Sequence, residues 1–312
     1  MNKKIAGIVA AAAVILVGGV YFMKGNNVEA ESASAIVKEI THKHGTTKIE
    51  GTPEKVIVLD YGALDALDAL DVNVTGLPKS GKIPAYLDKF KDDKYGNVGS
   101  VKEPDLEAIH ALEPDVIFMS GRMSDYYDEL SEIAPTIYVE SNGGKYLETF
   151  TESMEVYGEI FDKADKAKEL VSNLTEKAKE VKDKASGLKA STIMVNGRSI
   201  SAFGAGSRFG FIFNELGFSE ADENLQDSTH GQEVSFEYVV EKNPDYLFVV
   251  DRNAITGSSE ITAKDVVENE LVKQTNAYKN GKIVYLDPVT WYTVSGGYTS
   301  TLNMIEEVRD AI

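Results

Sequence analysis

The chain has 312 residues, which is enough for two domains of ordinary size. Hydrophobic residues make up 43 % and charged residues 26 %, as in a soluble globular protein, and the formal net charge of −18 argues against nucleic acid or an anionic membrane surface as a partner. The sequence contains no cysteine, which excludes disulfides, thiolate metal sites and cysteine nucleophiles.

Residues 1–30 have the pattern of an export segment. Asn2–Lys4 is basic, residues 5–23 are largely apolar, and Val28–Ala30 supplies small residues at the usual cleavage spacing. One interpretation is a signal peptide that is removed after Ala30. The other is an uncleaved anchor, because an apolar stretch of this length can just cross a bilayer. In both cases the lysines keep the N-terminus inside, so the main body is exported to the outer face of the cytoplasmic membrane or released there.

The first part of the exported chain is predicted to be a linker followed by an α/β lobe. Residues 31–51 are polar and show no clear period, so we expect a linker there. Residues 52–145 are predicted to form the N-terminal lobe. Its expected elements are a buried strand at 56–60, a helix through 64–70, a strand at 72–77, a helix near 125–133 and a strand at 136–139.

The longest helical stretch of the chain follows this lobe. It extends from Tyr146 to about Ser186, contains no proline, and has apolar residues from Phe150 to Ala167 at helical spacing. We predict a connecting helix over 146–168 that acts as a rigid strut between two lobes. Two consecutive helices with a break near 165–170 are the alternative.

Residues 169–312 are predicted to form a C-terminal α/β lobe. The fold class is therefore α/β, with two Rossmann-like lobes joined by a long backbone helix and a ligand cleft between the lobes. The expected elements of the second lobe are a strand at 191–195, a helix around 209–216, a helix at 262–278, a strand at 283–286 and a terminal helix at 298–312.

Two segments, 103–122 and 233–252, read as one unit written twice at a constant offset of 130 residues. Each copy has the pattern of an amphipathic helix, a Pro-Asp turn, a buried strand and then an arginine. We interpret the repeat as a duplicated α/β lobe, with two unrelated units of similar composition as the alternative. The identical pairs are Glu103/Glu233, Glu107/Glu237, Pro114/Pro244, Asp115/Asp245, Phe118/Phe248 and Arg122/Arg252.

The repeated arginines indicate an anion site. Arg122 and Arg252 follow the predicted strands, and ligands of open α/β sheets bind beyond the carboxyl ends of the strands. If the lobes face each other, two guanidinium groups meet in one cleft. Arg208 adds a third, because it lies in the glycine-rich turn Gly204–Gly210, which has the wrong spacing for a dinucleotide fingerprint.

Other candidate residues have weaker local signals. His230 lies in a polar loop, where a histidine is usually solvated, and the neighbours Trp291 and Tyr292 either wall a cleft or belong to the core. The chain has only four histidines and no cysteine, which argues against a zinc or manganese site built by the protein itself. The sequence also lacks the Gly-x-Ser-x-Gly, P-loop and His-Glu-x-x-His motifs, so we expect no enzymatic activity.

Over residues 50–312 the chain resembles the extracytoplasmic binding proteins of bacterial ABC importers whose two lobes are joined by a helical backbone. Within that class it resembles the subgroup for ferric catecholate siderophores of the petrobactin and enterobactin kind. The matching segments are Val58-Leu59-Asp60-Tyr61-Gly62, Ser120-Gly121-Arg122, Gly206-Ser207-Arg208-Phe209, Thr229-His230-Gly231, Val250-Asp251-Arg252 and Trp291-Tyr292.

The resemblance implies a role for each candidate residue. Arg122, Arg208 and Arg252 would surround the iron–catecholate centre, whose charge of about −3 suits charge-assisted donors. His230 and Tyr292 would contact iron where the siderophore leaves coordination sites free, with Trp291 beside them. Lys79 and Lys82 are weaker candidates for positive charge at the rim. The only metal is then the Fe³⁺ of the ligand, and no intrinsic cofactor is expected.

The resemblance also implies a membrane partner. Glu107 and Glu237, at equivalent positions of the repeat, would each meet arginines on one subunit of a permease dimer, and we expect the binding protein itself to be a monomer. The chain lacks the lipid-anchored cysteine common in Gram-positive relatives. The alternatives are a binding protein of the same architecture for haem, cobalamin or a hydroxamate siderophore and, more remotely, an envelope enzyme acting on an anionic substrate.

Overall fold

The computed structural model describes residues 37–141, 143–226, 228, 230–257 and 260–312. The predictions for residues 1–30 lie outside the described residues. Within the described ranges, no helix combines the length and the apolar character that crossing a bilayer requires.

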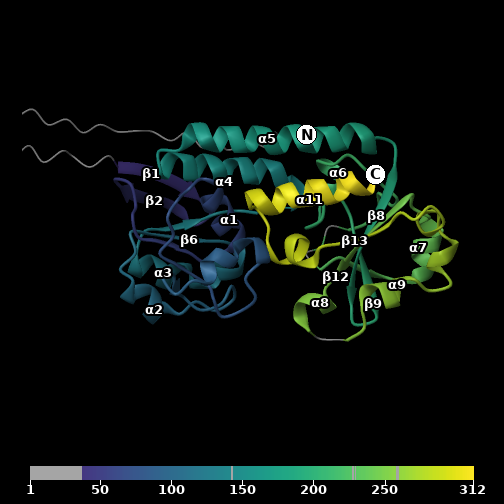
Figure 1. Cartoon of the computed structure of the whole chain (residues 1–312), viewed down its shortest axis with the longest axis horizontal. Coiled ribbons are helices and arrows are strands. Elements are labelled where there is room, and N and C mark those ends of the chain that lie inside the picture. Colours follow the sequence, from purple (N-terminus) through teal and green to yellow (C-terminus); the bar gives the residue numbers. More distant parts are fainter. Residues whose placement is uncertain (1–36, 142, 227, 229, 258–259) are drawn as a thin grey trace, which may run out of the picture.

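The described residues form two α/β lobes that lie side by side beneath a pair of long helices (Figure 1). In the first lobe five parallel strands follow the order β5-β4-β3-β6-β7, and in the second the order is β11-β9-β8-β12-β13, with β10 beside β8. The bounds are β3 Val56–Val58, β4 Gly76–Leu77, β5 Gly96–Asn97, β6 Val116–Met119, β7 Thr136–Tyr138, β8 Lys189–Asn196, β9 Ser199–Phe203, β10 Ser219–Glu220, β11 Gln232–Val234, β12 Tyr246–Asp251 and β13 Ile283–Leu286.

Helices cover both faces of these sheets, as apolar runs of strand length require. Their bounds are α1 Tyr61–Ala69, α2 Leu106–Ala111, α3 Tyr127–Ile133, α4 Tyr146–Ile160, α5 Ala164–Ala185, α6 Phe211–Asn214, α7 Phe236–Lys242, α8 Asn253–Thr256, α9 Ala263–Val267, α10 Asn276–Lys279 and α11 Tyr298–Ala311. The helix expected over 262–278 is therefore interrupted between α9 and α10. The two-lobe α/β fold class is confirmed.

The sequence repeat has the same structure in both lobes. Helices α2 and α7, and strands β6 and β12, begin at positions that are 130 residues apart. In each lobe the aspartate of the Pro-Asp turn exchanges hydrogen bonds with the residue that leads into the neighbouring strand. The backbone N–H of Asp115 donates to the carbonyl of Lys55 and its carboxylate accepts from the N–H of Lys55, and Asp245 does the same with Lys189. These bonds align the paired parallel strands.

Two helices, and not one, follow the first lobe. Helix α4 ends at Ile160, α5 begins at Ala164, and the turn between them contains Asp162 at a φ of 56°. The helix expected over 146–168 thus breaks before the expected 165–170, and it is α5 that extends over both lobes (Figure 1). The division into lobes at 52–145 and 169–312 stays a prediction.

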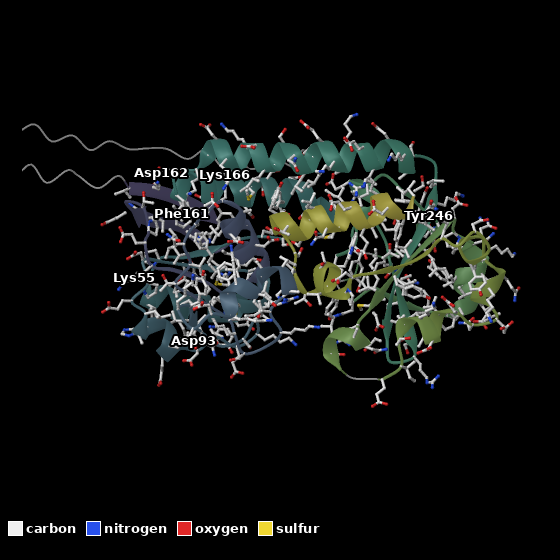
Figure 2. All side chains as sticks on the ribbon, in the orientation of Figure 1. Lys55, Asp93, Phe161, Asp162, Lys166 and Tyr246 are labelled. Carbon is white, nitrogen blue, oxygen red and sulfur yellow. The ribbon has the colours of Figure 1, made fainter. Side chains whose placement is uncertain are left out.

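Polar contacts fasten the α4–α5 turn to the first lobe. The buried Lys38 ammonium donates to the carbonyl of Ile160 at 2.8 Å and to the Asp162 carboxylate at 2.9 Å. Lys166 of α5 pairs with Asp71, which follows α1. Figure 2 shows Asp162 and Lys166 at the end of the helix pair that lies over this lobe. The long helices are therefore held rigidly at this end.

Residues 37–50, expected to be part of a linker, form an antiparallel hairpin of β1 (Val37–His42) and β2 (Gly45–Glu50). Its side chains Ile40 and Ile49 are only 3 % and 1 % exposed. The two strands contain only three apolar residues, Val37, Ile40 and Ile49, which are too few to produce a visible period in the sequence. The hairpin therefore belongs to the folded body rather than to a loose leader.

Candidate functional site

The site lies where a turn of the second lobe meets the first lobe. After β13 the chain makes a π-helical turn, Val289–Thr293, and then enters α11. Tyr292 lies in this turn and is partly exposed. Three guanidinium groups from separate segments converge on it, and we call Arg122, Arg208, Arg252 and Tyr292 together the arginine site.

Each arginine makes its own contact with Tyr292. The Arg252 Nε donates to the phenol oxygen at 3.0 Å. The carbonyl oxygen of Tyr292 accepts from Arg208 Nη2 at 2.9 Å and from Arg122 Nη2 at 3.3 Å. Arg122 also donates to the carbonyl of Thr293 at 3.0 Å. Because Arg122 belongs to the first lobe and the turn to the second, these bonds join the two lobes.

Strand ends and a tight turn position the three arginines. Arg122 and Arg252 follow β6 and β12, so they occupy equivalent places at the carboxyl ends of paired parallel strands. Arg208 lies in the turn between β9 and α6, where the hydroxyl of Ser207 donates to the carbonyl of Gly204 at 2.6 Å. The fold thus places the two repeated arginines and the loop arginine around one point, as expected for a ligand site of an open α/β sheet.

The electrostatics of the site favour an anion. Burial lowers the pKa of Arg208, as do the charges of Arg122 and Arg252, although contact with Tyr292 opposes this. The Arg208 guanidinium lies 4.2 Å from the ring centroid of Tyr292, a cation–π distance. Among the described residues, no carboxylate forms an ion pair with these three arginines. In the part of the chain that the structure describes, the three positive charges are therefore not neutralised by a carboxylate.

The phenol of Tyr292 is poised to ionise more easily than an ordinary tyrosine. Burial alone would raise its pKa, but the hydrogen bond from Arg252 and the charges of Arg252 and Arg208 outweigh burial, and the pKa is lowered. A phenolate oxygen is a ligand that proteins use for ferric iron. Among the described residues, no three His, Asp or Glu side chains gather into a metal site.

The other candidate residues lie in different surroundings. His230 is exposed, in the turn before β11, and within the described residues it makes no hydrogen bond to the arginine site. The Lys79 ammonium donates to the carbonyls of Asp92 and Tyr95, whereas Lys82 is exposed. The contacts of these residues with a ligand stay predictions.

Trp291 lies in the core beside the site. It is 5 % exposed, its ring centroid is 6.2 Å from that of Phe211, and its indole N–H donates to Glu307 at 2.7 Å. The sequence left open whether Trp291 walls the cleft or belongs to the core, and its surroundings are those of a core residue.

Sequence reasoning missed one polar partner of the arginine site. Asn196, the last residue of β8, accepts from Arg252 Nη1 at 2.8 Å. Its place at the carboxyl end of a strand was the available signal, because that is where ligand-site residues collect. Arg252 is thus held by Asn196 on one side and by the Tyr292 phenol on the other.

The two repeated glutamates lie on separate lobes. Glu107 and Glu237 are exposed in the first turns of α2 and α7, behind the N-caps Asp105 and Ser235. Hydrogen bonds from its own backbone N–H and from Ser235 lower the pKa of Glu237. Figure 1 shows α2 and α7 in different lobes, so the two carboxylates belong to well-separated surfaces.

Comparison with known proteins gives close relatives. The petrobactin-binding protein YclQ of Bacillus subtilis (strain 168) is 47 % identical over 293 residues, which cover 93 % of this chain and 91 % of YclQ. The crystal structure of YclQ matches with a TM-score of 0.84 at 46 % identity, over 88 % of this chain and 98 % of the other.

Two further solved structures are similar. The periplasmic catecholate-siderophore binding protein VctP of Vibrio cholerae has a TM-score of 0.83 at 36 % identity, covering 88 % of this chain and 99 % of VctP. The iron uptake ABC transporter substrate-binding protein PiuA of Streptococcus pneumoniae has a TM-score of 0.82 at 40 % identity, covering 90 % and 100 %. A periplasmic binding protein family model matches residues 56–290. The match of the family model over most of the chain, and relatives that share 47 % and 36 % identity with it over most of its length, show that this chain belongs to the periplasmic binding protein family.

Proposed function

We propose that this protein captures ferric catecholate siderophores outside the cytoplasm and delivers them to the permease of an ABC importer. The observation that carries the proposal is the convergence of Arg122, Arg208 and Arg252 on Tyr292 between the lobes. A ferric tris-catecholate has a charge of about −3, which the three guanidinium groups match, two of them partly buried and that of Arg122 exposed. YclQ is named as a petrobactin-binding protein and VctP as a catecholate-siderophore binding protein, which supports the same ligand class.

The ligand would take over hydrogen bonds that the turn now receives. Arg122 and Arg208 donate to neutral carbonyl oxygens of the turn, and charged catecholate oxygens are stronger acceptors. The Tyr292 phenolate, and His230 from the turn before β11, would bind iron directly when a siderophore leaves coordination sites open. Lys82 is free to approach the rim, whereas Lys79 would first have to leave the Asp92 and Tyr95 carbonyls.

The delivery step requires export and a permease. Residues 1–30 would export the chain, either as a cleaved signal or as an anchor, and VctP is described as periplasmic. Glu107 and Glu237 would each form an exposed salt bridge with one permease subunit. Such bridges are individually weak, but they fix the register of a complex and raise its association rate.

A ligand titration tests the proposal. The purified protein is titrated with a ferric tris-catecholate, a ferric bis-catecholate, haem and a ferric hydroxamate, and binding is followed by visible absorption and by fluorescence of the one tryptophan. We expect nanomolar affinity for the catecholates and much weaker binding of the others. Preference for haem or the hydroxamate would overturn the ligand class, and chemical conversion of a bound ligand would favour an enzyme.

A further inference from the structure

One carboxylate outside the arginine site holds the turn that carries Tyr292. Glu307 lies in α11 and is partly buried, and this burial raises the pKa of its carboxyl group. One of its oxygens accepts from the backbone N–H of Asp287 at 2.8 Å, and the other accepts from the indole N–H of Trp291 at 2.7 Å. Glu307 therefore binds the chain at Asp287, which leads into the turn, and at Trp291, directly before Tyr292.

Two hydrogen bonds within the segment 287–291 close the turn next to the Glu307 carboxylate. The Asp287 carboxylate accepts from the N–H of Thr290 at 2.7 Å, and the Asp287 carbonyl accepts from the N–H of Trp291 at 3.0 Å. Trp291 is itself buried against Phe211. A shift of the indole would therefore displace the peptide that bears Tyr292, because the two residues are adjacent in the chain.

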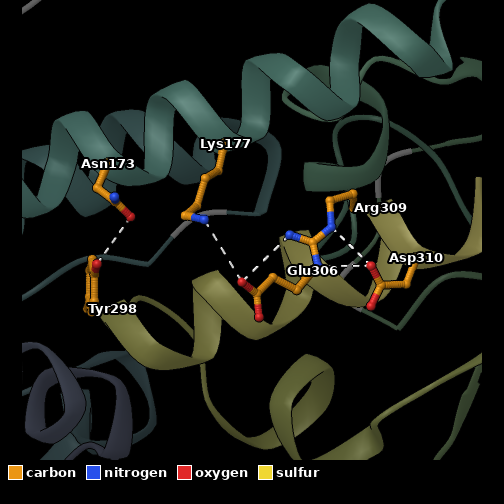
Figure 3. Close-up of polar contacts among 6 residues, drawn as sticks. All are labelled: Asn173, Lys177, Tyr298, Glu306, Arg309 and Asp310. Carbon is orange, nitrogen blue, oxygen red and sulfur yellow. Dashed lines mark hydrogen bonds and ion pairs between the residues drawn. The ribbon is translucent and has the colours of Figure 1, made fainter.

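Helix α11 is a fixed support for Glu307. Tyr298, its first residue, donates to Asn173 of α5 at 3.2 Å (Figure 3). At its beginning the buried Asp65 carboxylate of α1 accepts from the N–H groups of Thr299 and Ser300, at 3.1 and 2.8 Å. Glu307 is thus anchored to the first lobe and to the long backbone helix.

We propose that Glu307 is a positioning residue for ligand binding, which acts through Trp291 to place the Tyr292 phenol on Arg252 and the Tyr292 carbonyl on Arg122 and Arg208. The inference rests on the proposed function only in that the arginine site is the ligand site. The positioning of Tyr292 does not itself depend on a ligand, because the contact between Tyr292 and Arg252 exists in the protein alone. Loosening the turn would separate the phenol from the guanidinium that lowers its pKa.

The experiment compares Glu307→Gln and Trp291→Phe with the parent. Glu307→Gln keeps the size of the side chain but removes its charge and leaves one acceptor oxygen in place of two, and Trp291→Phe removes the indole donor with some loss of volume. The double variant tests whether the two residues act through the bond between the indole and the carboxylate. Glu306→Gln is the matched control, because Glu306 is the adjacent residue of α11 and contacts Lys177 and Arg309 instead of the turn (Figure 3). Thermal unfolding of each variant, followed by circular dichroism, establishes that it is folded.

The first measurement is the ultraviolet titration of tyrosine in the ligand-free protein. The chain has 15 tyrosines, so the curve of Tyr292→Phe is subtracted to isolate the Tyr292 step. We expect this step to move to higher pH by about one unit in Glu307→Gln and in Trp291→Phe, because a hydrogen bond to a charged group contributes about that much. The double variant should shift no further, and Glu306→Gln should titrate like the parent.

The second measurement is the affinity for a ferric bis-catecholate, followed by visible absorption. We expect a loss of about tenfold in Glu307→Gln and Trp291→Phe and none in Glu306→Gln. An unmoved Tyr292 titration in folded Glu307→Gln and Trp291→Phe would overturn the positioning role, whatever the affinity. A moved titration with unchanged affinity would leave the positioning of Tyr292 intact and would contradict the assignment of the arginine site as the ligand site.

Discussion

Three guanidinium groups share one tyrosine in the arginine site, although like charges repel each other. Hydrogen bonds to the Tyr292 carbonyl and the π face of its ring offset part of this repulsion. If the arginine site binds the proposed ligand, the remaining repulsion would favour binding, because the anion would neutralise charges that have no carboxylate partner among the described residues. The positive charges would then already be in place before a ligand of high negative charge arrives.

At this scale, replacement of any one of the three arginines by alanine should weaken ferric catecholate binding by about 2–5 kcal/mol, the usual cost of removing one partner of a desolvated charge pair. Lysine should restore only part of the loss, because it lacks the planar guanidinium fork. Isothermal titration calorimetry measures the effect. The exposed Arg198→Ala, which lies outside the site, is the control and should bind like the parent. If the triple Arg122, Arg208 and Arg252 alanine variant keeps parent affinity, the site assignment is wrong.

Iron ligation by Tyr292 and His230 should depend on the siderophore. In Tyr292→Phe and His230→Ala we expect the charge-transfer band of a ferric bis-catecholate complex to shift, because the protein then supplies the missing ligands. The band of a hexadentate tris-catecholate complex should stay unchanged, since its coordination sphere is already complete. Visible absorption and resonance Raman spectra measure both. Equal shifts for both ligands would indicate packing rather than coordination.

At the scale of elements, the joint between α1 and α11 fastens the first lobe to the last helix of the chain. The Asp65 carboxylate is 1 % exposed and caps the beginning of α11 through two backbone N–H groups. The packing is so close that a Cβ on Gly62 would lie 1.8 Å from the carbonyl oxygen of Ser295. Helix α11 and the turn that precedes it are part of the second lobe, and these contacts also hold them against the first lobe.

Burial raises the pKa of Asp65 above its ordinary value of 3.8, against the opposing effect of the hydrogen bonds from Ser300 and Thr299. The folded state thus holds the proton more tightly than the unfolded state. The stability that Asp65 contributes is fully present below the ordinary pKa and decreases as pH rises through the folded-state pKa. Relative to Asp65→Asn, the parent should therefore lose free energy of unfolding as pH increases from about 4.

Urea unfolding across this pH range measures the difference in free energy of unfolding between the parent and Asp65→Asn. All other groups titrate in both proteins, so their contributions cancel in this difference. Asp93→Asn, at an exposed position of the same lobe, is the control and should follow the parent. A difference between the parent and Asp65→Asn that stays constant with pH would show that burial does not perturb Asp65.

For the whole molecule, the duplication of the lobes gives two equivalent surfaces, each with a glutamate in the first turn of a helix. A permease with two-fold symmetry would meet these surfaces at the same time. Glu107→Lys combined with Glu237→Lys should therefore abolish siderophore-dependent iron uptake in cells and leave siderophore affinity unchanged, because both side chains are exposed.

Radioactive iron uptake and in vitro affinity, measured in parallel, separate docking from ligand binding. The control is Glu176→Lys with Glu180→Lys, which makes the same change of charge on the exposed face of α5. Normal uptake by the Glu107 and Glu237 variant would remove the docking role. Loss of its ligand affinity would place these residues in the fold or in the ligand site.

Much of the architecture was predictable because local sequence patterns indicate it. The strand at 283–286 and the terminal helix from Tyr298 agree with the structure, as does the repeated unit, since buried runs and helical spacing are properties of short segments. The hairpin at 37–50 was not predictable, because its two isoleucines are buried by contact with the rest of the lobe. The break in the long helical stretch was expected near 165–170 and lies a few residues earlier, at Asp162, because Lys38 stabilises the turn there from across the fold.

The sequence by itself determined two α/β lobes, a long helical connection and arginines at equivalent strand ends, because periodicity and internal repetition are visible without coordinates. Only the tertiary structure decided what those arginines face. Arg122 and Thr293 are 171 residues apart in the chain, and nothing local links Arg252 to the Tyr292 phenol. The hydrogen bond from Trp291 to Glu307 could not be predicted from the sequence either, because the partner of a side chain depends on which helix packs against its turn.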